Sequence, residues 1–191
     1  MRLQFTGLMR RILQLLSPTL ILFLAGDIFS QHNEAFTQKR VPKFTDYPIR
    51  EIQTSRSIHV DVGSTPYTSC FRTMLRETAR RGVKFAGHYA LSYWGCGSEC
   101  AQIGIVDLRT GRSYVSPFWV TGVGIKTRPD SRLLVVNDPA EVAKHFGDDV
   151  TTIPGEYQPE YYLWTGRKLL LIEDGKIGRE PQPEFELCKK R

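Results

Sequence analysis

The sequence lacks the motifs that mark several common classes of protein. It contains no H-E-x-x-H or G-x-S-x-G motif and no glycine-rich loop that would cradle phosphate groups. The net charge is +6, but three of the cations form the C-terminal stretch 189–191, and no Lys/Arg-rich run lies elsewhere. A nucleic-acid partner is therefore not expected, because nothing in the chain would follow a phosphate backbone. The sequence indicates no cofactor.

Apolar runs long enough to cross a membrane are also missing. A run of 14 residues, 12–25, follows Arg10 and Arg11. A membrane-spanning helix needs about 20 apolar residues, whereas the apolar region of a secretory signal needs only about 7–15. The small residue Ser30 offers a cleavage point before Gln31. The pattern predicts a signal peptide over 1–30 and a periplasmic or secreted protein, which touches the membrane only through this segment if it stays uncleaved.

Cysteine is sparse, with four residues in the chain. In an oxidising compartment Cys70, Cys96, Cys100 and Cys188 form an even set that can pair in three ways. The C-x3-C spacing of the central pair differs from the C-x2-C of a zinc knuckle, so no metal site is expected. We expect a small Cys96–Cys100 ring and a long Cys70–Cys188 crosslink, with the crossed pairings left open.

The mature chain divides into a segment with few clear signals, 31–63, and a single domain, 64–191. In that domain the apolar spacing predicts one long amphipathic helix over about 65–81, ending at Gly82. Its buried face would carry Tyr67, Cys70, Phe71, Met74, Leu75 and Thr78. A second, short helix is predicted over about 139–146, capped by Asn137 or Asp138.

The rest of the domain reads as short strands. From Phe85 the apolar period changes to two, and turn residues separate the successive strand segments. The predicted strands cover 85–94, 101–108, 113–118, 132–136, 161–164 and 168–173. The fold class is therefore α+β: a mainly antiparallel β-meander with the long helix packed on it.

The stretch FAGHYALSYWGCGSEC, 85–100, carries the candidate site residues. A disulfide-closed hairpin tip would present Trp94, Gly95, Gly97 and Glu99 for binding. We add His88 to this binding set because small neighbours on its strand face leave room for an imidazole.

A second interpretation of the same stretch is catalytic. Cys96 or Cys100 could act as a thiol nucleophile or as a redox pair, with His88 as base and Glu99 orienting it. Low-pKa thiols usually sit at helix N-termini or beside cations, and the adjacent carboxylate of Glu99 would raise a thiol pKa. The sequence therefore favours a structural role for these cysteines.

Several strings of the chain resemble a group of small exported bacterial proteins of unknown function. The matching strings are FAGHYALSYWGCGSEC, IGIVDLRTG, PDSRLLVVN and YYLWTG, and the resemblance spans roughly 65–172. The shared pattern is N/K-F-A-G-H-Y, W-G-C-G-x-x-C, D-x-x-T-G and D-S-R-L-L. The resemblance implies export and a β-rich arrangement, and it implies no activity.

The function expected from the sequence is that of a small exported, disulfide-stabilised binding or inhibitory domain of the cell envelope, without catalysis. Its partner would be another envelope protein. The alternative, from a different class, is an envelope thiol enzyme, a hydrolase or a redox protein, that uses Cys96 or Cys100 with His88.

Overall fold

The computed structural model describes residues 40–53, 59–65, 67–97, 100–147 and 153–183. The chain divides into two compact units, 1–39 and 40–191, and every described residue belongs to the second unit. The predicted signal peptide, Glu99 and Cys188 lie outside the described residues. No helix in the described part of the chain has the length and apolar character needed to cross a membrane.

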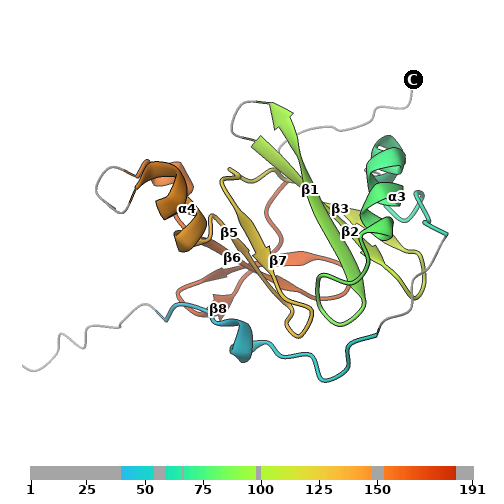
Figure 1. The fold of residues 1–191 in the computed structure, drawn as a ribbon, viewed down its shortest axis with the longest axis horizontal. Helices are drawn as coiled ribbons and strands as arrows, with labels where there is room; N and C mark the ends of the chain where they lie inside the picture. The colour runs from blue at the N-terminus through green and yellow to red at the C-terminus, as the bar shows by residue number, and fades with distance from the viewer. Residues whose placement is uncertain (1–39, 54–58, 66, 98–99, 148–152, 184–191) are drawn as a thin grey trace, which may run out of the picture. The chain divides into compact units, whose positions relative to one another are not determined.

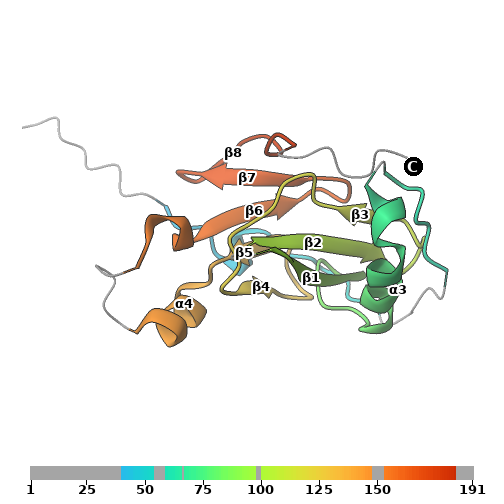
Figure 2. The same cartoon turned by 90° about the horizontal axis from the view of Figure 1, so that it is seen from above.

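The strands form two antiparallel sheets, with their members in chain order. The first sheet contains β1 (Tyr89–Gly97), β2 (Cys100–Asp107) and β3 (Ser113–Val115). The second contains β4 (Ile125–Thr127), β5 (Leu133–Val136), β6 (Glu160–Trp164), β7 (Leu169–Glu173) and β8 (Lys176–Ile177). Figures 1 and 2 show β1 and β2 crossing the strands of the second sheet.

The main core lies between the two sheets. The first sheet contributes inward side chains such as Leu91, Ile103 and Ile105, and the second contributes Leu134 and Val136. Successive residues of a strand point to opposite faces, so Leu133 and Val135 lie on the outer face of the second sheet. Both faces of β5 are therefore buried, which explains its unbroken apolar sequence.

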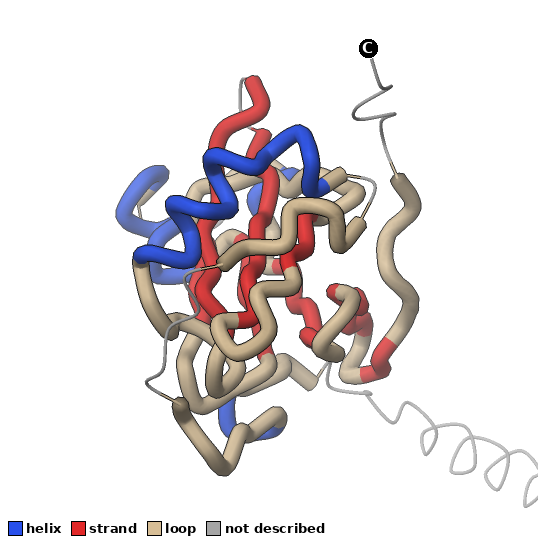
Figure 3. The backbone as a smooth tube through the Cα atoms, turned by 90° about the vertical axis from the view of Figure 1, so that its right-hand side faces the viewer, coloured by secondary structure: helices blue, strands red, loops and turns tan. Residues whose placement is uncertain are grey.

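The prediction of a single sheet carrying a long amphipathic helix over 65–81 is wrong. The structure has two sheets, and the helical residues form a 3-10 turn, η2 (Thr68–Phe71), followed by α3 (Arg72–Arg80) of nine residues. The helix packs on the outer face of the first sheet, with Leu75 and Ala79 against Val106. Figure 3 shows α3 crossing the strands on this side.

The 3-10 turn also changes which side chains are buried. It advances about 120° per residue instead of 100°, so the apolar stripe read with an α-helical period loses its phase. Thr68 takes the buried position, and its hydroxyl donates to the Val62 carbonyl at 2.7 Å. Cys70 and Met74, which were predicted to be buried, are exposed, whereas Leu75 is buried as predicted.

The strand predicted from Phe85 begins only at Tyr89. The backbone groups of Phe85 and Tyr89 hydrogen-bond to one another, at 3.0 and 2.9 Å, so 85–88 forms a tight turn. This turn buries Phe85 completely between the sheets. It also places His88 at the start of β1, opposite the end of β2.

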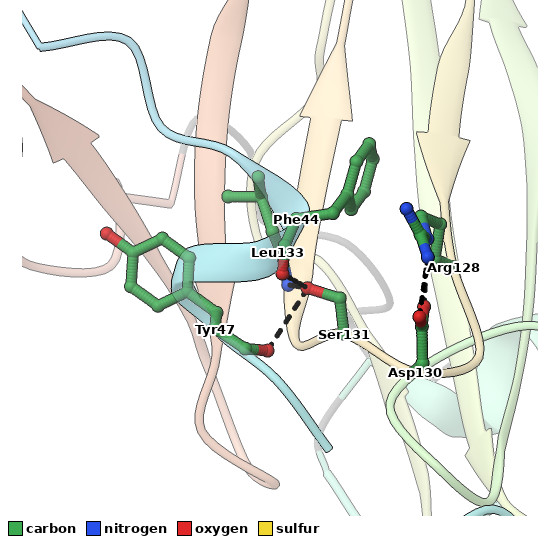
Figure 4. Close-up of polar contacts among 6 residues, drawn as sticks. All are labelled: Phe44, Tyr47, Arg128, Asp130, Ser131 and Leu133. Carbon is green, nitrogen blue, oxygen red and sulfur yellow. Dashed lines mark hydrogen bonds and ion pairs between the residues drawn. The ribbon is translucent and has the colours of Figure 1, made fainter. Parts of the chain in front are cut away.

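Two further segments complete the unit. The helix α4 (Pro139–Phe146) lies where the short helix was predicted. Residues 40–53 cover the outer face of the second sheet, where Phe44 and Tyr47 pack over Leu133. Figure 4 shows the Ser131 hydroxyl within hydrogen-bonding distance of the carbonyls of Phe44, at 2.8 Å, and Tyr47, at 3.1 Å.

Candidate functional site

The hairpin tip has the covalent closure that the sequence predicts. A disulfide joins Cys96 to Cys100, whose Cα atoms are 5.2 Å apart. The register of β1 and β2 shifts between Gly95 and Gly97, so Cys96 is an extra residue on its strand. Gly97 has a φ of 150°, a value that suits glycine at such a bulge. Cys70 is also disulfide-bonded, and its predicted partner, Cys188, lies outside the described residues.

Trp94 does not project from the tip. Its ring lies 5.1 Å from the ring of Phe71 and covers Gly104, where a Cβ would come within 2.5 Å of the indole. The side chain therefore belongs to the interface between α3 and the first sheet. Its neighbour Tyr93 is exposed, at 48%.

His88 and the tip cysteines are not brought together. His88 precedes β1, and Cys96 lies eight residues farther along an extended strand, which corresponds to roughly 25 Å. The Nε2 atom of His88 lies 3.6 Å from Oδ1 of Asp107, too far for a hydrogen bond, and has no hydrogen-bond partner among the described residues. A direct proton transfer from either cysteine to His88 would require a large rearrangement.

A cleft lies at this other end of the β1–β2 ladder, and we refer to it as the ladder-end cleft. Its volume is about 290 Å³, and four segments of the chain line it. The segment before η2 supplies Ser64 and Thr65. Tyr89 comes from the start of β1, and Trp164 and Arg167 come from the β6–β7 hairpin. The β2–β3 turn supplies Asp107, Thr110, Arg112 and Ser113.

Aromatic rings form one wall of the ladder-end cleft. Trp164 is 2% exposed and makes edge-to-face contacts with Tyr89, at 5.4 Å between centroids, and with Tyr114, at 5.2 Å. Such edge-to-face pairs hold ring orientations firmly. Gly166 follows in the hairpin turn with a φ of 91°, and a Cβ there would lie 3.4 Å from the Tyr89 hydroxyl. The backbone therefore approaches this hydroxyl closely.

Asp107 lines the ladder-end cleft and holds the β2–β3 turn in place. Its Oδ1 accepts hydrogen bonds from the backbone N–H groups of Arg109, at 2.8 Å, and Thr110, at 3.3 Å. These bonds shape the turn formed by the D-x-x-T-G sequence, 107–111. No hydrogen bond from the described residues reaches Oδ2 of the same carboxylate. One oxygen of Asp107 therefore shapes the turn, and the other remains available as an acceptor.

Two cations stand in the ladder-end cleft without a carboxylate partner. Neither Arg112 nor Arg167 forms an ion pair within the described ranges of the chain, although both line the cleft. Arg112 contributes to the lowered pKa of Asp61, after the hydrogen bonds that Asp61 accepts from Gly63 and Ser64. With Asp107 as the opposing carboxylate, the described charges of the lining sum to +1.

Two buried polar atoms of the lining have no hydrogen-bond partner among the described residues. They are Nε1 of Trp164 and Oγ1 of Thr65. The Trp164 indole is close enough to the Tyr89 hydroxyl to oppose the rise in its pKa, yet the two groups do not meet hydrogen-bond geometry. A buried donor without an acceptor is costly, by about 1–3 kcal/mol. Both atoms are buried, so a guest or a water in the cleft would reach them only after a small movement of the lining.

The pKa values of two groups beside the ladder-end cleft, His88 and Tyr89, are shifted so that the neutral form is favoured. Burial lowers the pKa of His88, against the opposing effect of Asp107. Burial also raises the pKa of Tyr89, followed by the charge of Asp107, while the Trp164 indole and two arginines act in the other direction. Both groups are therefore neutral at pH 7, and the charges present come from Asp107 and the arginines.

Sequence reasoning did not find this cleft. Asp107 lies in a turn, and Trp164, Gly166 and Arg167 lie in a hairpin, which fits the prediction that turn residues separate short strands. What it missed is that these two turns, some 60 residues apart in the chain, lie against one another. The contact between two packed sheets produces no periodic pattern in the sequence. The sequence therefore could not predict that these two turns lie together.

The described residues contain no group of three or more His, Cys, Asp or Glu side chains that could hold a metal ion. Comparison of the chain with protein-family models, with curated proteins and with solved structures gave no match.

Proposed function

We propose that the protein is a small exported, disulfide-stabilised binding domain of the cell envelope, without catalysis, and that its ligand occupies the ladder-end cleft. The cleft is concave and combines an aromatic wall with a few convergent polar groups, the usual composition of a small-molecule site. Export rests on the signal-like N-terminal sequence and on the presence of disulfides.

The Trp164 indole carries this proposal. It donates one hydrogen bond at most, and two aromatic neighbours hold it in place. Its N–H lies near the Tyr89 hydroxyl but forms no hydrogen bond of standard geometry with the described residues. A donor kept rigid and unpaired beside an open cleft is pre-organised for a ligand acceptor.

Binding is favoured over thiol chemistry by the placement of the sulfur atoms. Cys96 and Cys100 are joined to one another at the far end of β1 from His88, so no free thiolate stands beside a base. The carboxylate nearest His88, Asp107, is engaged in its own turn. Neither arrangement supports a nucleophile with an adjacent base.

A blocking variant tests the proposal. Thr110 is exposed and lines the ladder-end cleft, so Thr110→Trp should fill it without disturbing the core. Native mass spectrometry of protein taken gently from the producing cells should show a bound small molecule on the wild type. The molecule should be absent from Thr110→Trp and retained by Arg76→Trp, a matched change on the exposed side of α3. Equal occupancy in Thr110→Trp, or none in the wild type, would contradict the proposal.

Export is tested separately by cell fractionation and N-terminal sequencing. The mature protein should be recovered from the envelope or the medium with a first residue near Gln31. An unprocessed chain in the cytoplasm would contradict this part of the proposal while leaving the ladder-end cleft in place.

The hairpin tip supports a second candidate, the docking of another envelope protein. Gly95, Cys96 and Gly97 are exposed, and Figure 1 shows this end of the hairpin reaching beyond the other strands. A pull-down with the exported form, compared with a variant in which residues 95–99 are scrambled, tests it. Capture of one protein by the wild type alone would support docking; identical profiles would count against it.

A further inference from the structure

The arginines of the ladder-end cleft indicate the charge of its ligand. Arg112 comes from the β2–β3 turn and Arg167 from the β6–β7 turn, so a guanidinium stands on each of two separate segments. Some basic side chains elsewhere are paired, as Lys126 is with Asp138 and Arg128 with Asp130. A guanidinium presents paired N–H groups that match the two oxygens of a carboxylate. The pair in the cleft therefore favours a ligand with a carboxylate.

The polar groups on the inner surface of the cleft indicate which functional groups the ligand has besides its carboxylate. Trp164 offers a donor, Thr65 a hydroxyl that can donate or accept, and Asp107 a carboxylate oxygen that can accept. Hydroxyl groups are the ligand groups that suit all three, because a hydroxyl both donates and accepts. The rings of Tyr89 and Trp164 supply an apolar wall for the carbon skeleton between them.

The volume limits the size of this molecule. At about 290 Å³ the cleft lies at the lower end of the range for small-molecule sites, which begins near 300 Å³. Such a space holds a six-membered ring with its substituents. It does not hold a nucleotide or a longer oligosaccharide.

We infer that the ladder-end cleft binds a hydroxylated carboxylic acid of monosaccharide size. Its carboxylate lies between Arg112 and Arg167, and its hydroxyl groups face Trp164, Thr65 and Asp107. This inference rests on the proposed function, and it adds the chemical class of the ligand.

Matched pairs of probes test the class. Glucuronate, galacturonate and gluconate carry the carboxylate, and glucose, galactose and sorbitol are their neutral counterparts. Each is titrated into the ¹⁵N-labelled full chain while the indole N–H resonance of Trp164, assigned through its backbone connectivity, is followed. At least one acid should shift this resonance and saturate, and its neutral counterpart should bind at least about tenfold more weakly, the loss of one charge-assisted hydrogen bond.

Two variants and a control locate the carboxylate. Arg112→Gln and Arg167→Gln should each weaken binding of the acid at least about tenfold and remove most of its advantage over the neutral counterpart. Neither guanidinium holds a structural ion pair in the described chain, so both variants should fold. Arg76→Gln makes the same change in net charge on the exposed side of α3 and should leave the affinity unchanged.

The outcomes separate this inference from the proposed function. Neutral probes that bind as tightly as the acids would overturn the ligand class and leave the cleft as a binding site. If neither Arg112→Gln nor Arg167→Gln changes the affinity for the acids, the ligand class is likewise overturned and the cleft remains a binding site. If none of the six probes moves the Trp164 resonance, the class is overturned, and the Thr110→Trp comparison decides independently whether the cleft binds anything.

Discussion

The two ends of the β1–β2 ladder are stabilised by different kinds of contact. At the tip, Gly97 pairs with Cys100, a disulfide joins Cys96 to Cys100, and the next residue of β2, Ala101, pairs with Val120. At the other end, Tyr89 pairs with Asp107, and side chains from four segments meet around the ladder-end cleft. The tip is closed by a local bond, whereas the cleft depends on contacts between the two sheets. The most conspicuous motif in the sequence therefore marks the simpler end.

The largest difference between the two ends should appear when a buried side chain is removed. Phe85 is fully buried beside the ladder-end cleft, so Phe85→Ala should lower the free energy of unfolding by about 3–5 kcal/mol. The matched change Tyr93→Ala, near the tip, removes a half-exposed ring and should cost about 0.5 kcal/mol or less. Urea denaturation measures both. Similar losses would mean that the tip is as integrated as the cleft end.

Opening the tip disulfide should have a smaller effect. Closing a five-residue loop contributes about 2 kcal/mol in the chain-entropy model, so the double variant Cys96→Ser, Cys100→Ser should lose no more than this. The ladder-end cleft lies at the other end of the strands and should keep its ligand affinity. A loss of cleft binding in this folded variant would show that the two ends are coupled.

Glycine substitutions compare the two ends at a finer level. Gly166 has a φ of 91°, so Gly166→Ala should cost about 1–2 kcal/mol through backbone strain and should crowd the Tyr89 hydroxyl. Gly95, at the tip, has only a carbonyl oxygen at 3.9 Å from an added Cβ, so Gly95→Ala should be nearly neutral. Thermal melts of the two variants give the comparison. Equal shifts in Tm for the two variants would show that the backbone is no more constrained at Gly166 than at Gly95.

The smallest expected effect is a pH dependence that belongs to the cleft end. Burial lowers the pKa of His88 below its ordinary value of 6.5, although the nearby Asp107 opposes this shift. The unfolded chain therefore binds more protons than the folded chain near that pH. The free energy of unfolding should fall as the pH is lowered through 6.5 and should level off below the folded pKa.

The measurement is a series of urea titrations between pH 7.5 and 5, above the range in which Asp61 and Asp130 titrate, because their pKa values are lowered from 3.8. His88→Gln should flatten the dependence, while the tip double variant should retain it. An unchanged slope in His88→Gln would place the titrating group elsewhere.

The features that the sequence predicted correctly are those set by residues close together in the chain. The turns of the hairpins carry their own chemistry, as at Asp107 and Gly166, and the strands between them were predicted well. The short helix at 139–146 was also predicted, since Pro139 and Gly147 bound it. These features depend on residues that are close in the chain.

The features that failed depend on packing. The stripe over 65–81 was read with one helical period, but the first turn is a 3-10 turn because the Thr68 hydroxyl bonds back to Val62 and Thr65. Division into two sheets and the meeting of Asp107 with Trp164 depend on which strands face one another. Alternation reveals that a strand has a buried face, and it does not reveal what covers that face.

The segment that covers the second sheet restricts how the protein can be processed. Phe44 and Tyr47 shield Leu133 and its neighbours, and Ser131 is bonded to the backbone of both. A protease that trimmed the chain past residue 43 would uncover an apolar surface and leave a buried hydroxyl without its acceptors. If the chain is processed as the signal-like sequence predicts, the cleavage site is expected to lie upstream of residue 43.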